Sequence, residues 1–253
     1  MNTKFLIVSA AYNVESWIEQ TFMSVLTQRY DNWKWIFMDD CSTDKTVENL
    51  KSLTERFPDK KDRVIIVEKT IKECSLYNIV DAINNMCCMP NSDETVIIIL
   101  DGDDWFTGPD VLQTLDKVYK ENNCWLTYGS YLEYPSYRMG SVHSPYPEKV
   151  VEERSFRKAD WHGSHLRSFK YGLFKHINQN DFKDKDGNFY DTAGDLALMF
   201  PMLEMSGGRF RFITDILYVY NIKNPLNDFK QNATAQLRLE KLIRNRPRYE
   251  AIV

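Results

Sequence analysis

Short apolar runs alternate with amphipathic segments along the first 130 residues of the chain. The apolar runs predict buried strands at residues 5–10, 33–38, 64–67, 95–100 and 125–132. Between them, helical spacing of apolar residues predicts helices after Asn13, after Asp44, over about 76–88, and after Gly108-Pro109. Strands that are apolar throughout and separated by helices are typical of a parallel sheet with helices on both faces. We therefore predict an α/β fold with a mostly parallel central sheet.

The pattern changes after residue 132, where neither the strand period nor the helix period continues. We interpret residues 133–160 as a long loop. The later elements predicted are a short helix over 164–176, a helix over 194–206 that contains Pro201 and ends at Gly207-Gly208, a strand-like segment over 210–221, and a charged helix over 233–245. The second half of the chain is expected to be less regular than the first.

The composition is that of a globular protein, because 43% of the 253 residues are hydrophobic and a core can form without disulfides. The net charge of −4 provides no global positive field, so we expect no nucleic-acid partner. The five cysteines form no CxxC pair and no zinc-binding spacing with histidine, which indicates unpaired thiols in a reducing compartment.

No segment is expected to cross a membrane, since the longest aliphatic run, VIIIL at 96–100, is far too short. The N-terminal apolar stretch could also belong to a signal peptide, but its length of about seven residues fits a buried strand better. We therefore expect a soluble, cytoplasmic protein without an integral membrane segment, and peripheral association with a membrane stays open.

Acidic residues follow two of the predicted strands directly. Because ligands of parallel sheets bind beyond the carboxyl ends of the strands, these acids are candidate site residues. Asp101 and Asp103, separated by one glycine, can share Mg²⁺ or Mn²⁺. The alternative is a turn with solvated acids, which the repulsion among Asp101, Asp103 and Asp104 disfavours. Asp39-Asp40 can accept hydrogen bonds from a base or a ribose, or can simply belong to a strand-to-helix turn.

These residues also carry a family resemblance. The stretch FLIVSAAYNVESWIEQTFMSVLTQRYDNWKWIFMDDCSTDKT resembles the opening of glycosyltransferase family 2, which is inverting and has the GT-A fold. The similarity lies in Tyr12-Asn13, in Ser24–Gln28 and in Asp39–Asp44. LDGDDWF then stands where that family carries its metal-binding Asp-x-Asp motif. The motifs occur in the family's order over roughly residues 4–106.

The resemblance implies a single GT-A domain over 1–253, with a Rossmann-like, mostly parallel sheet. Residues 1–106 would form the nucleotide-sugar-binding half, and residues 107–253 the half that binds the acceptor and holds the catalytic base. The implied reaction is metal-dependent, inverting transfer of a hexose from a nucleoside-diphosphate sugar, most often a UDP-sugar, to an acceptor hydroxyl. Mn²⁺ or Mg²⁺ would be the cofactor, and the acceptor would be a glycan, a protein or a small molecule.

The resemblance also implies roles for particular residues at the donor end of the site. The nucleotide-binding candidates are Ala10, Tyr12, Glu15, Asp39, Asp40, Lys72 and Asp101. Of these, Asp40 with Asp39 beside it would recognise the base, and Lys72 would supply a basic group. Asp103 would lie nearest the metal, and Asp101 would face the ribose or the metal. The Gln-x-x-Arg-Trp signature of processive members is absent from the sequence, which implies a non-processive enzyme.

The family places its catalytic base in a Glu-Asp pair that opens a helix downstream of the metal motif. The matching position here is Asp195, with Gly194 in place of the glutamate, and Asp191 is the competing candidate. A structural alternative is that Asp195 only caps its helix.

On the acceptor side, Trp161 and His162 are candidates, because the apolar face of a sugar can stack on an aromatic ring. Ordinary packing is the alternative for both residues, and a zinc pair of His162 with His165 is a further one.

Two other functions compete with glycosyl transfer. VIIILDGDD also matches the strand and Asp-x-Asp motif of haloacid-dehalogenase-like phosphatases, although three strands precede it here. A GT-A-like protein that binds a sugar nucleotide or glycan without turnover is the other alternative, and Gly194 in place of the glutamate favours it. Release of nucleoside diphosphate, release of phosphate, or binding without turnover would separate the three.

Overall fold

The computed structural model describes residues 2–86, 92–226 and 233–252, and its main feature is a seven-stranded sheet. The strands lie in the order β10-β6-β9-β4-β1-β2-β3. Their bounds are β1 (Phe5–Ala11), β2 (Trp33–Asp39), β3 (Val64–Glu68), β4 (Val96–Ile99), β6 (Leu126–Tyr128), β9 (Arg167–Lys170) and β10 (Phe210–Phe212). Only β9 runs antiparallel to its neighbours, so the predicted mostly parallel sheet is confirmed.

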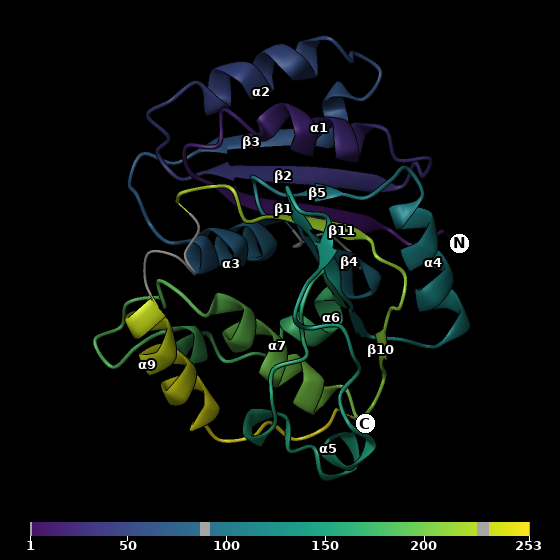
Figure 1. The fold of residues 1–253 in the computed structure, drawn as a ribbon, viewed down its shortest axis with the longest axis vertical. Coiled ribbons are helices and arrows are strands. Elements are labelled where there is room, and N and C mark those ends of the chain that lie inside the picture. The colour runs from purple at the N-terminus through teal and green to yellow at the C-terminus, as the bar shows by residue number, and fades with distance from the viewer. Residues whose placement is uncertain (1, 87–91, 227–232, 253) are drawn as a thin grey trace.

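Helices cover both faces of this sheet (Figure 1). On one face lie α1 (Ile18–Leu26), α2 (Thr46–Glu55) and α4 (Val111–Glu121), and on the other lie α3 (Ser75–Met86), α6 (Tyr171–Phe174) and α7 (Gly194–Met205). Successive side chains of a strand point to opposite faces. Phe5 and Ile7 of β1 therefore pack with the first group of helices, and Leu6 and Val8 pack with the second. This double burial explains why the strands are apolar throughout.

A smaller sheet of four short strands stands beside the large one. It has the order β5-β11-β7-β8, with β5 (Trp105–Phe106), β11 (Tyr218–Asn221), β7 (Tyr131–Tyr134) and β8 (Arg138–Met139). The remaining helices are α5 (Glu148–Glu153), α9 (Ala233–Arg244) and the 3-10 turns η1 (Lys61–Arg63), η2 (Ser92–Glu94), η3 (Phe156–Lys158) and η4 (Gln179–Phe182). Strands from both predicted halves of the chain join the large sheet, while the division at residue 106 stays a prediction.

Most elements of the first 125 residues match their predictions to within a few residues. The helices predicted over 194–206 and 233–245 are confirmed as α7, which contains Pro201, and α9. The end of the predicted helix over 76–88 lies outside the described residues. No helix in the described part of the chain combines the length and the apolar composition needed to cross a membrane.

Four predicted segments beyond residue 124 differ from the structure. The runs 125–132 and 210–221 are each two strands, β6 with β7 and β10 with β11, because each run leaves one sheet and enters the other. The first half of the predicted helix 164–176 is β9, which fills the place between β4 and β6. The predicted loop 133–160 contains β8 and α5. For the strands β6, β7, β9, β10 and β11, pairing with distant strands, which local periodicity does not report, decided the outcome. The strand β8 instead forms a local pair with β7.

Asn13 was expected to cap the helix that follows it, but in the structure it does not cap α1. Its backbone is left-handed (φ 53°), and its side-chain oxygen accepts a hydrogen bond from the amide of Thr43 at 2.8 Å. The helix starts five residues later, at Ile18. Asn13 therefore joins two loops at the carboxyl ends of β1 and β2.

The turn after β4 packs against the end of β1. A Cβ added to Gly102 would lie 2.4 Å from Cβ of Ala11 and 3.2 Å from the carbonyl oxygen of Ala10. Only glycine leaves room for this approach. The close contact explains the small residue between Asp101 and Asp103, and it presses both carboxylates toward the end of the strands.

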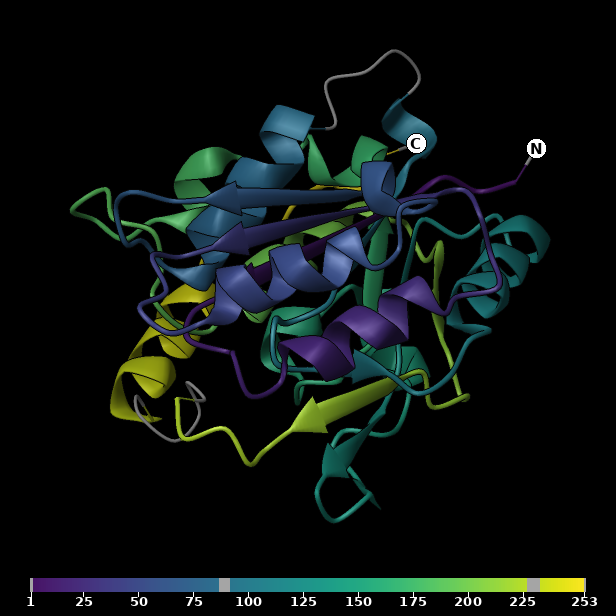
Figure 2. The ribbon, with the colours of Figure 1, turned by 90° about the horizontal axis from the view of Figure 1, so that it is seen from above.

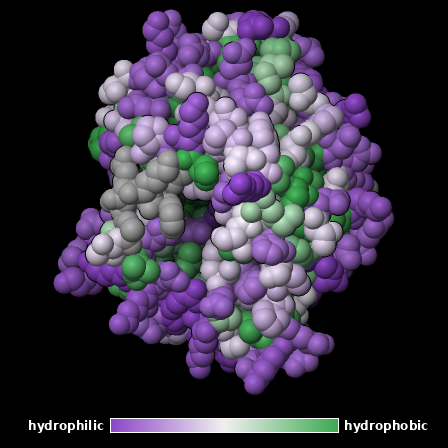
Figure 3. All heavy atoms as spheres, in the orientation of Figure 1, coloured by the Kyte–Doolittle hydropathy of each residue, from purple (hydrophilic) through white to green (hydrophobic). Residues whose placement is uncertain are grey.

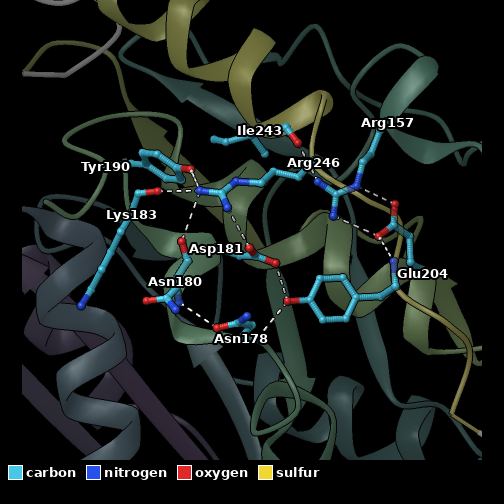
Figure 4. A network of polar contacts seen from close by, with 10 residues as sticks. Arg157, Asn178, Asn180, Asp181, Lys183, Tyr190, Glu204, Ile243 and Arg246 are labelled. Atoms are coloured by element: carbon cyan, nitrogen blue, oxygen red, sulfur yellow. Dashed lines mark hydrogen bonds and ion pairs between the residues drawn. The ribbon is translucent and has the colours of Figure 1, made fainter. Parts of the chain in front are cut away.

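A buried polar network anchors α7 behind the sheet (Figure 4). Arg157 donates to both carboxylate oxygens of Glu204 at 2.7 and 3.0 Å and to the carbonyl oxygen of Ile243 at 2.7 Å. Arg246 donates to Asp181 at 3.1 Å and to the hydroxyl of Tyr190 at 2.8 Å. The network ties η3, η4 and the chain after α9 together, and Glu204 joins it to the C-terminal end of α7.

We expect Glu204→Gln to lower the free energy of unfolding by about 3–5 kcal/mol, because it leaves the guanidinium of Arg157 buried without its counter-charge. The side chains of Arg157 and Glu204 are 8% and 1% exposed. As a control, Glu153→Gln breaks the ion pair with Lys149, whose side chains are 53% and 82% exposed, and should cost less than about 0.5 kcal/mol. Urea unfolding measures both, and equal costs would contradict the importance of the buried pair.

We also expect Gly102→Ala to destabilise the fold by about 1–3 kcal/mol, because its methyl group overlaps Ala11 at the end of β1. Gly108→Ala is the matched control, since a Cβ at Gly108 meets nothing within 4 Å, and it should change stability by less than about 0.5 kcal/mol. Thermal unfolding of the two variants compares them directly. If Gly102→Ala were as stable as Gly108→Ala, the close packing of this turn would be refuted.

Candidate active site

A cleft of about 920 Å³ lies beyond the carboxyl ends of β1, β2 and β4. In Figure 2 the arrowheads of β2 and β3 point to this side of the molecule, and Figure 3 shows a hollow between the part that contains β1–β3 and the part that contains α7 and α9. Most of the predicted site residues line this one cleft. They are Ala10, Tyr12, Asp40, Lys72, Asp101, Asp103, Trp161, Asp191 and Asp195.

Three predicted residues do not line the cleft. Glu15 accepts a hydrogen bond from the amide of Lys45 at 2.8 Å, which joins the loop after β1 to the start of α2. Asp39 is buried, and one of its oxygens accepts the amide of Ser42 at 3.0 Å. The ring of His162 packs against the ring of Tyr146, with centroids 4.9 Å apart, and His162 Nδ1 lies 3.2 Å from the hydroxyl of Ser144. All three have structural partners close to the cleft.

At the end of β1 and β2, an aromatic ring and two charged side chains form one wall of the cleft. Nζ of Lys72 lies 3.2 Å from the centroid of the Tyr12 ring, a close cation–π contact. Asp40 is buried, and its Oδ1 accepts the amide of Glu73 at 2.8 Å. This bond holds the segment 72–74 against the end of β2, so that Lys72 and Asp40 face the same space.

The three acids after β4 are divided between the cleft and the interior. Asp101 and Asp103 line the cleft, whereas Asp104 is fully buried. Asp104 accepts hydrogen bonds from the hydroxyl of Tyr218 at 2.6 Å and from the amide of Asn221 at 2.7 Å. It therefore fastens β11 to the turn. The sequence showed the three acids but not this difference, because the partners of Asp104 lie more than 110 residues away.

Charge repulsion and burial act on these acids together. Burial raises the pKa of Asp101, the guanidinium of Arg167 opposes that shift, and the carboxylate of Asp195 adds to it. Burial, followed by the charges of Asp103 and Asp101, raises the pKa of Asp104 well above its usual value. A cation in the cleft would favour the ionised forms.

The donor set fits a hard divalent cation. Carboxylate oxygens are the ligands that Mg²⁺ and Mn²⁺ prefer, and such ions often take one or two carboxylates and leave positions for water or phosphate. Within residues 2–86, 92–226 and 233–252 no three His, Cys, Asp or Glu side chains are grouped to enclose a metal by themselves. Asp101 and Asp103 are the two carboxylates of this turn that line the cleft. Asn224 donates to Oδ2 of Asp103 at 2.7 Å and orients it.

Asp195 lies in the first turn of α7, opposite the acids after β4. Its Oδ2 is 3.4 Å from Nη1 of Arg167 on β9. The positive charge of the same guanidinium also lowers the pKa of Asp101, so Arg167 interacts with both carboxylates. Asp191 is exposed at the edge of the cleft. Arg167 was missed by the sequence analysis, which assigned it to a helix and had no signal for its neighbours across the sheet.

Gly194 has a packing reason to be small. A Cβ added there would lie 3.1 Å from Cβ of Leu76 on α3. The preceding residue, Ala193, has a left-handed backbone with φ 56°. The turn into α7 is therefore pressed against α3, which accounts for the glycine where the family pattern has glutamate.

His165 is buried within a group of tyrosine rings. Its ring stacks on that of Tyr218 at 4.3 Å, and the rings of Tyr131 and Tyr220 lie within 5.5 Å. Burial, followed by the charge of Arg167, lowers the pKa of His165 well below its usual value, so the imidazole is neutral. His162 and His165 thus have separate partners, and the structure gives no support to a zinc pair.

Three comparisons with known proteins bear on this site. The model of glycosyl transferase family 2 matches residues 6–182. An uncharacterized glycosyltransferase of Haemophilus influenzae is 27% identical over 125 residues, which are 49% of this chain and 46% of that protein. The chain spans less than half the length of the curated relatives that it matches.

Two solved structures share the fold at low sequence identity. One is TarS of S. aureus in complex with UDP-GlcNAc, with a TM-score of 0.63 and 14% identity. The matched region covers 88% of this chain and 59% of the TarS chain. The other is the mannosyltransferase PcManGT of Pyrobaculum calidifontis, in complex with GDP-Man and Mn²⁺, with a TM-score of 0.66 and 18% identity. The matched region covers 98% of this chain and 66% of the PcManGT chain. The fold is the GT-A fold that the sequence predicted. Because the family model matches more than half of this chain, the chain belongs to glycosyl transferase family 2.

Proposed function

We propose that this chain is a metal-dependent, inverting and non-processive glycosyltransferase that transfers a hexose from a nucleoside-diphosphate sugar to an acceptor hydroxyl. The observation that carries the proposal is that Asp101, Asp103 and Asp195 line the same cleft. Inverting transfer needs a group that receives the leaving diphosphate on one side and a base on the other. The groups for the diphosphate lie at the carboxyl ends of β1, β2 and β4, and the base lies at the start of α7.

The donor nucleotide is assigned to the wall formed by Tyr12, Asp40 and Lys72, with Ala10 at the end of β1. An aromatic face, a carboxylate that accepts hydrogen bonds and a cation suit a base, its N–H groups and a diphosphate, respectively. We infer a UDP-sugar as the donor. The complexes of the two structural neighbours, with UDP-GlcNAc and with GDP-Man, support a nucleoside-diphosphate sugar in general. Glu15 and Asp39 would act indirectly, since they hold the loops that carry Asn13, Ser42 and Lys45.

Asp103 and Asp101 would hold Mn²⁺ or Mg²⁺. The ion would neutralise the diphosphate as it leaves. Asn224 keeps the carboxylate of Asp103 directed. The hydroxyl of Tyr218 donates to Asp104 at 2.6 Å and accepts the backbone amide of Asp101 at 3.2 Å. The site residues thus arrive at their positions through bonds to the smaller sheet.

Asp195 is the proposed base, and Arg167 is proposed to direct it. The ion pair at 3.4 Å orients the carboxylate in the first turn of α7, where an acceptor hydroxyl would approach from the open side of the cleft. Proton transfer to the carboxylate would accompany attack of that hydroxyl on the anomeric carbon. Trp161 lines the same part of the cleft and packs against Phe200, with ring centroids 5.3 Å apart. We assign it to the apolar face of the acceptor, which is a glycan, a protein or a small molecule.

The two competing functions have less support. The family to which the chain belongs favours glycosyl transfer over the phosphatase alternative. Binding without turnover rested on Gly194, and the contact with Leu76 gives that glycine a reason unrelated to loss of activity.

A cation-dependent stabilisation by nucleotide is expected. At about a hundred times its dissociation constant, UDP with Mn²⁺ should raise the free energy of unfolding by roughly 2.7 kcal/mol, and most of this gain should be lost in chelator. Asp103→Ala should lose the cation-dependent part, because it removes the ligand nearest the metal. Thermal shift with UDP and with GDP, each with Mn²⁺ or EDTA, measures the effect.

Asp186→Ala is the control for the metal experiment, because Asp186 is an exposed acid outside the cleft. It should respond to UDP and Mn²⁺ as the wild type does. Equal stabilisation with Mn²⁺ and with EDTA, in the wild type and in Asp103→Ala, would remove the metal from the proposal.

Asp195→Asn should reduce sugar transfer by about 10²–10⁴, the usual contribution of a general base. The amide keeps the shape and the contact to Arg167, so nucleotide binding and the melting temperature should hardly change. Asp191→Asn is the matched control and should do much less. The measurement is nucleoside-diphosphate release with a screened panel of donors. Inactivity of Asp191→Asn with an active Asp195→Asn would move the base by one helical turn, and full activity of both would favour binding without turnover.

A further inference from the structure

The outer face of α9 carries exposed leucines together with cations. Leu237 is 68% exposed and Leu242 is 36% exposed. Arg238 and Lys241 are exposed between them, and neither has an ion-pair partner among the described residues. The opposite face of the helix buries Leu239 and Ile243 in the core. Exposed leucines in a helix that already has a buried face are not needed to hold that helix in place.

Further positive charge surrounds a surface hollow beside α9. The hollow has a volume of about 560 Å³, and Leu242, Lys183, Lys185 and Arg246 contribute to its lining. Asp184 is the acid in that lining. Arg246 is occupied by Asp181 and Tyr190, and Nζ of Lys183 lies 5.1 Å from the centroid of the Phe189 ring. Lys185 is exposed.

Residues 237–248 are basic, whereas the chain as a whole is acidic. The net charge of the protein is −4, yet residues 237–248 contain Arg238, Lys241, Arg244, Arg246 and Arg248 against the single acid Glu240. Glu240 pairs with Arg244 in the same helix at 2.8 Å. The cations that stay outside such internal pairs therefore face solvent on one side of the molecule. In the orientation shared by Figures 1 and 3, α9 lies at the lower left, where Figure 3 shows green apolar atoms among purple polar ones.

This face also borders the cleft. Gln236, the residue before Leu237, contributes to the cleft lining, as does Leu226. In Figure 2, α9 lies on the side to which the arrowheads of β2 and β3 point. A surface in contact with the outer face of α9 would therefore lie next to the opening where an acceptor would enter.

We propose that the outer face of α9, with the hollow lined by Lys183 and Lys185, docks on an anionic lipid surface. Lysine and arginine are attracted by anionic headgroups, and exposed leucines gain free energy when they enter the boundary between headgroups and acyl chains. The combination of free cations with exposed leucines matches that surface in charge and in polarity. Docking itself is independent of the proposed transferase activity. Only its consequence, that the acceptor is presented from the lipid surface, rests on that activity.

Sedimentation with vesicles tests the docking. The full chain should bind vesicles of phosphatidylcholine mixed with phosphatidylglycerol, and should bind pure phosphatidylcholine far more weakly. Arg238→Gln with Lys241→Gln should weaken binding to the anionic vesicles by about 25-fold, since each cation contributes about fivefold. Leu237→Gln with Leu242→Gln should weaken binding about tenfold or more, because the apolar contact is lost.

Lys117→Gln with Lys120→Gln removes the same charge from α4, on the other side of the molecule in Figure 1, and should leave vesicle binding unchanged. Asp195→Asn should also bind vesicles as the wild type does, which separates failure of docking from failure of the proposed catalysis. Melting temperatures verify that each variant is folded.

Three results would overturn the proposal. The first is equal binding to anionic and neutral vesicles. The second is full competition by inorganic phosphate, which would indicate a site for a free anion. The third is a wild type that sediments as a dimer in the ultracentrifuge and becomes a monomer in the leucine variant, which would assign this face to a second copy of the chain.

Discussion

The contact between Gly102 and the end of β1 is the constraint on which the arrangement of the site depends. It brings the turn after β4 within van der Waals reach of Ala11, so that Asp101 and Asp103 stand at the edge of the sheet. The same turn places Asp104 inside, where Tyr218 and Asn221 donate to it. One short turn therefore positions two carboxylates in the cleft and joins the smaller sheet to the large one.

Positive charge is distributed so that the carboxylates of the cleft can remain close together. Arg167 on β9 forms an ion pair with Asp195 and acts on Asp101 across the cleft. Arg167 is the first residue of β9, the strand that lies between β4 and β6 and pairs with both. The single antiparallel strand of the sheet is thus the element that relates the donor side of the cleft to the proposed base.

The molecule is electrically asymmetric outside the cleft as well. Acids gather at the carboxyl ends of the strands, whereas exposed cations and two exposed leucines gather on α9 beside the opening. Internal ion pairs hold other arginines within the fold: Arg157 of η3 pairs with Glu204 of α7, and Arg246 of the C-terminal segment pairs with Asp181 of η4. The arginines of this segment therefore divide into those that hold the fold and those that face outward, a division that charge counting alone does not show.

The sequence by itself determined most elements of residues 1–124 and a mostly parallel sheet covered on both faces, because strands buried on both faces must be apolar throughout and the helices between them must be amphipathic. The GT-A fold was implied by the resemblance to a known family. The sequence also marked Asp101 and Asp103 as candidates, because acids that follow a buried parallel strand lie where such sheets bind ligands, and the family resemblance added Asp195; the roles of all three stay predictions. Only the tertiary structure decided that β6 and β7 belong to different sheets, that Arg167 lies on a strand and that Asp104 turns inward. The physical reason is that local periodicity reports whether a side chain is buried, whereas the partner it is buried against comes from segments more than 40 residues away in each of these cases.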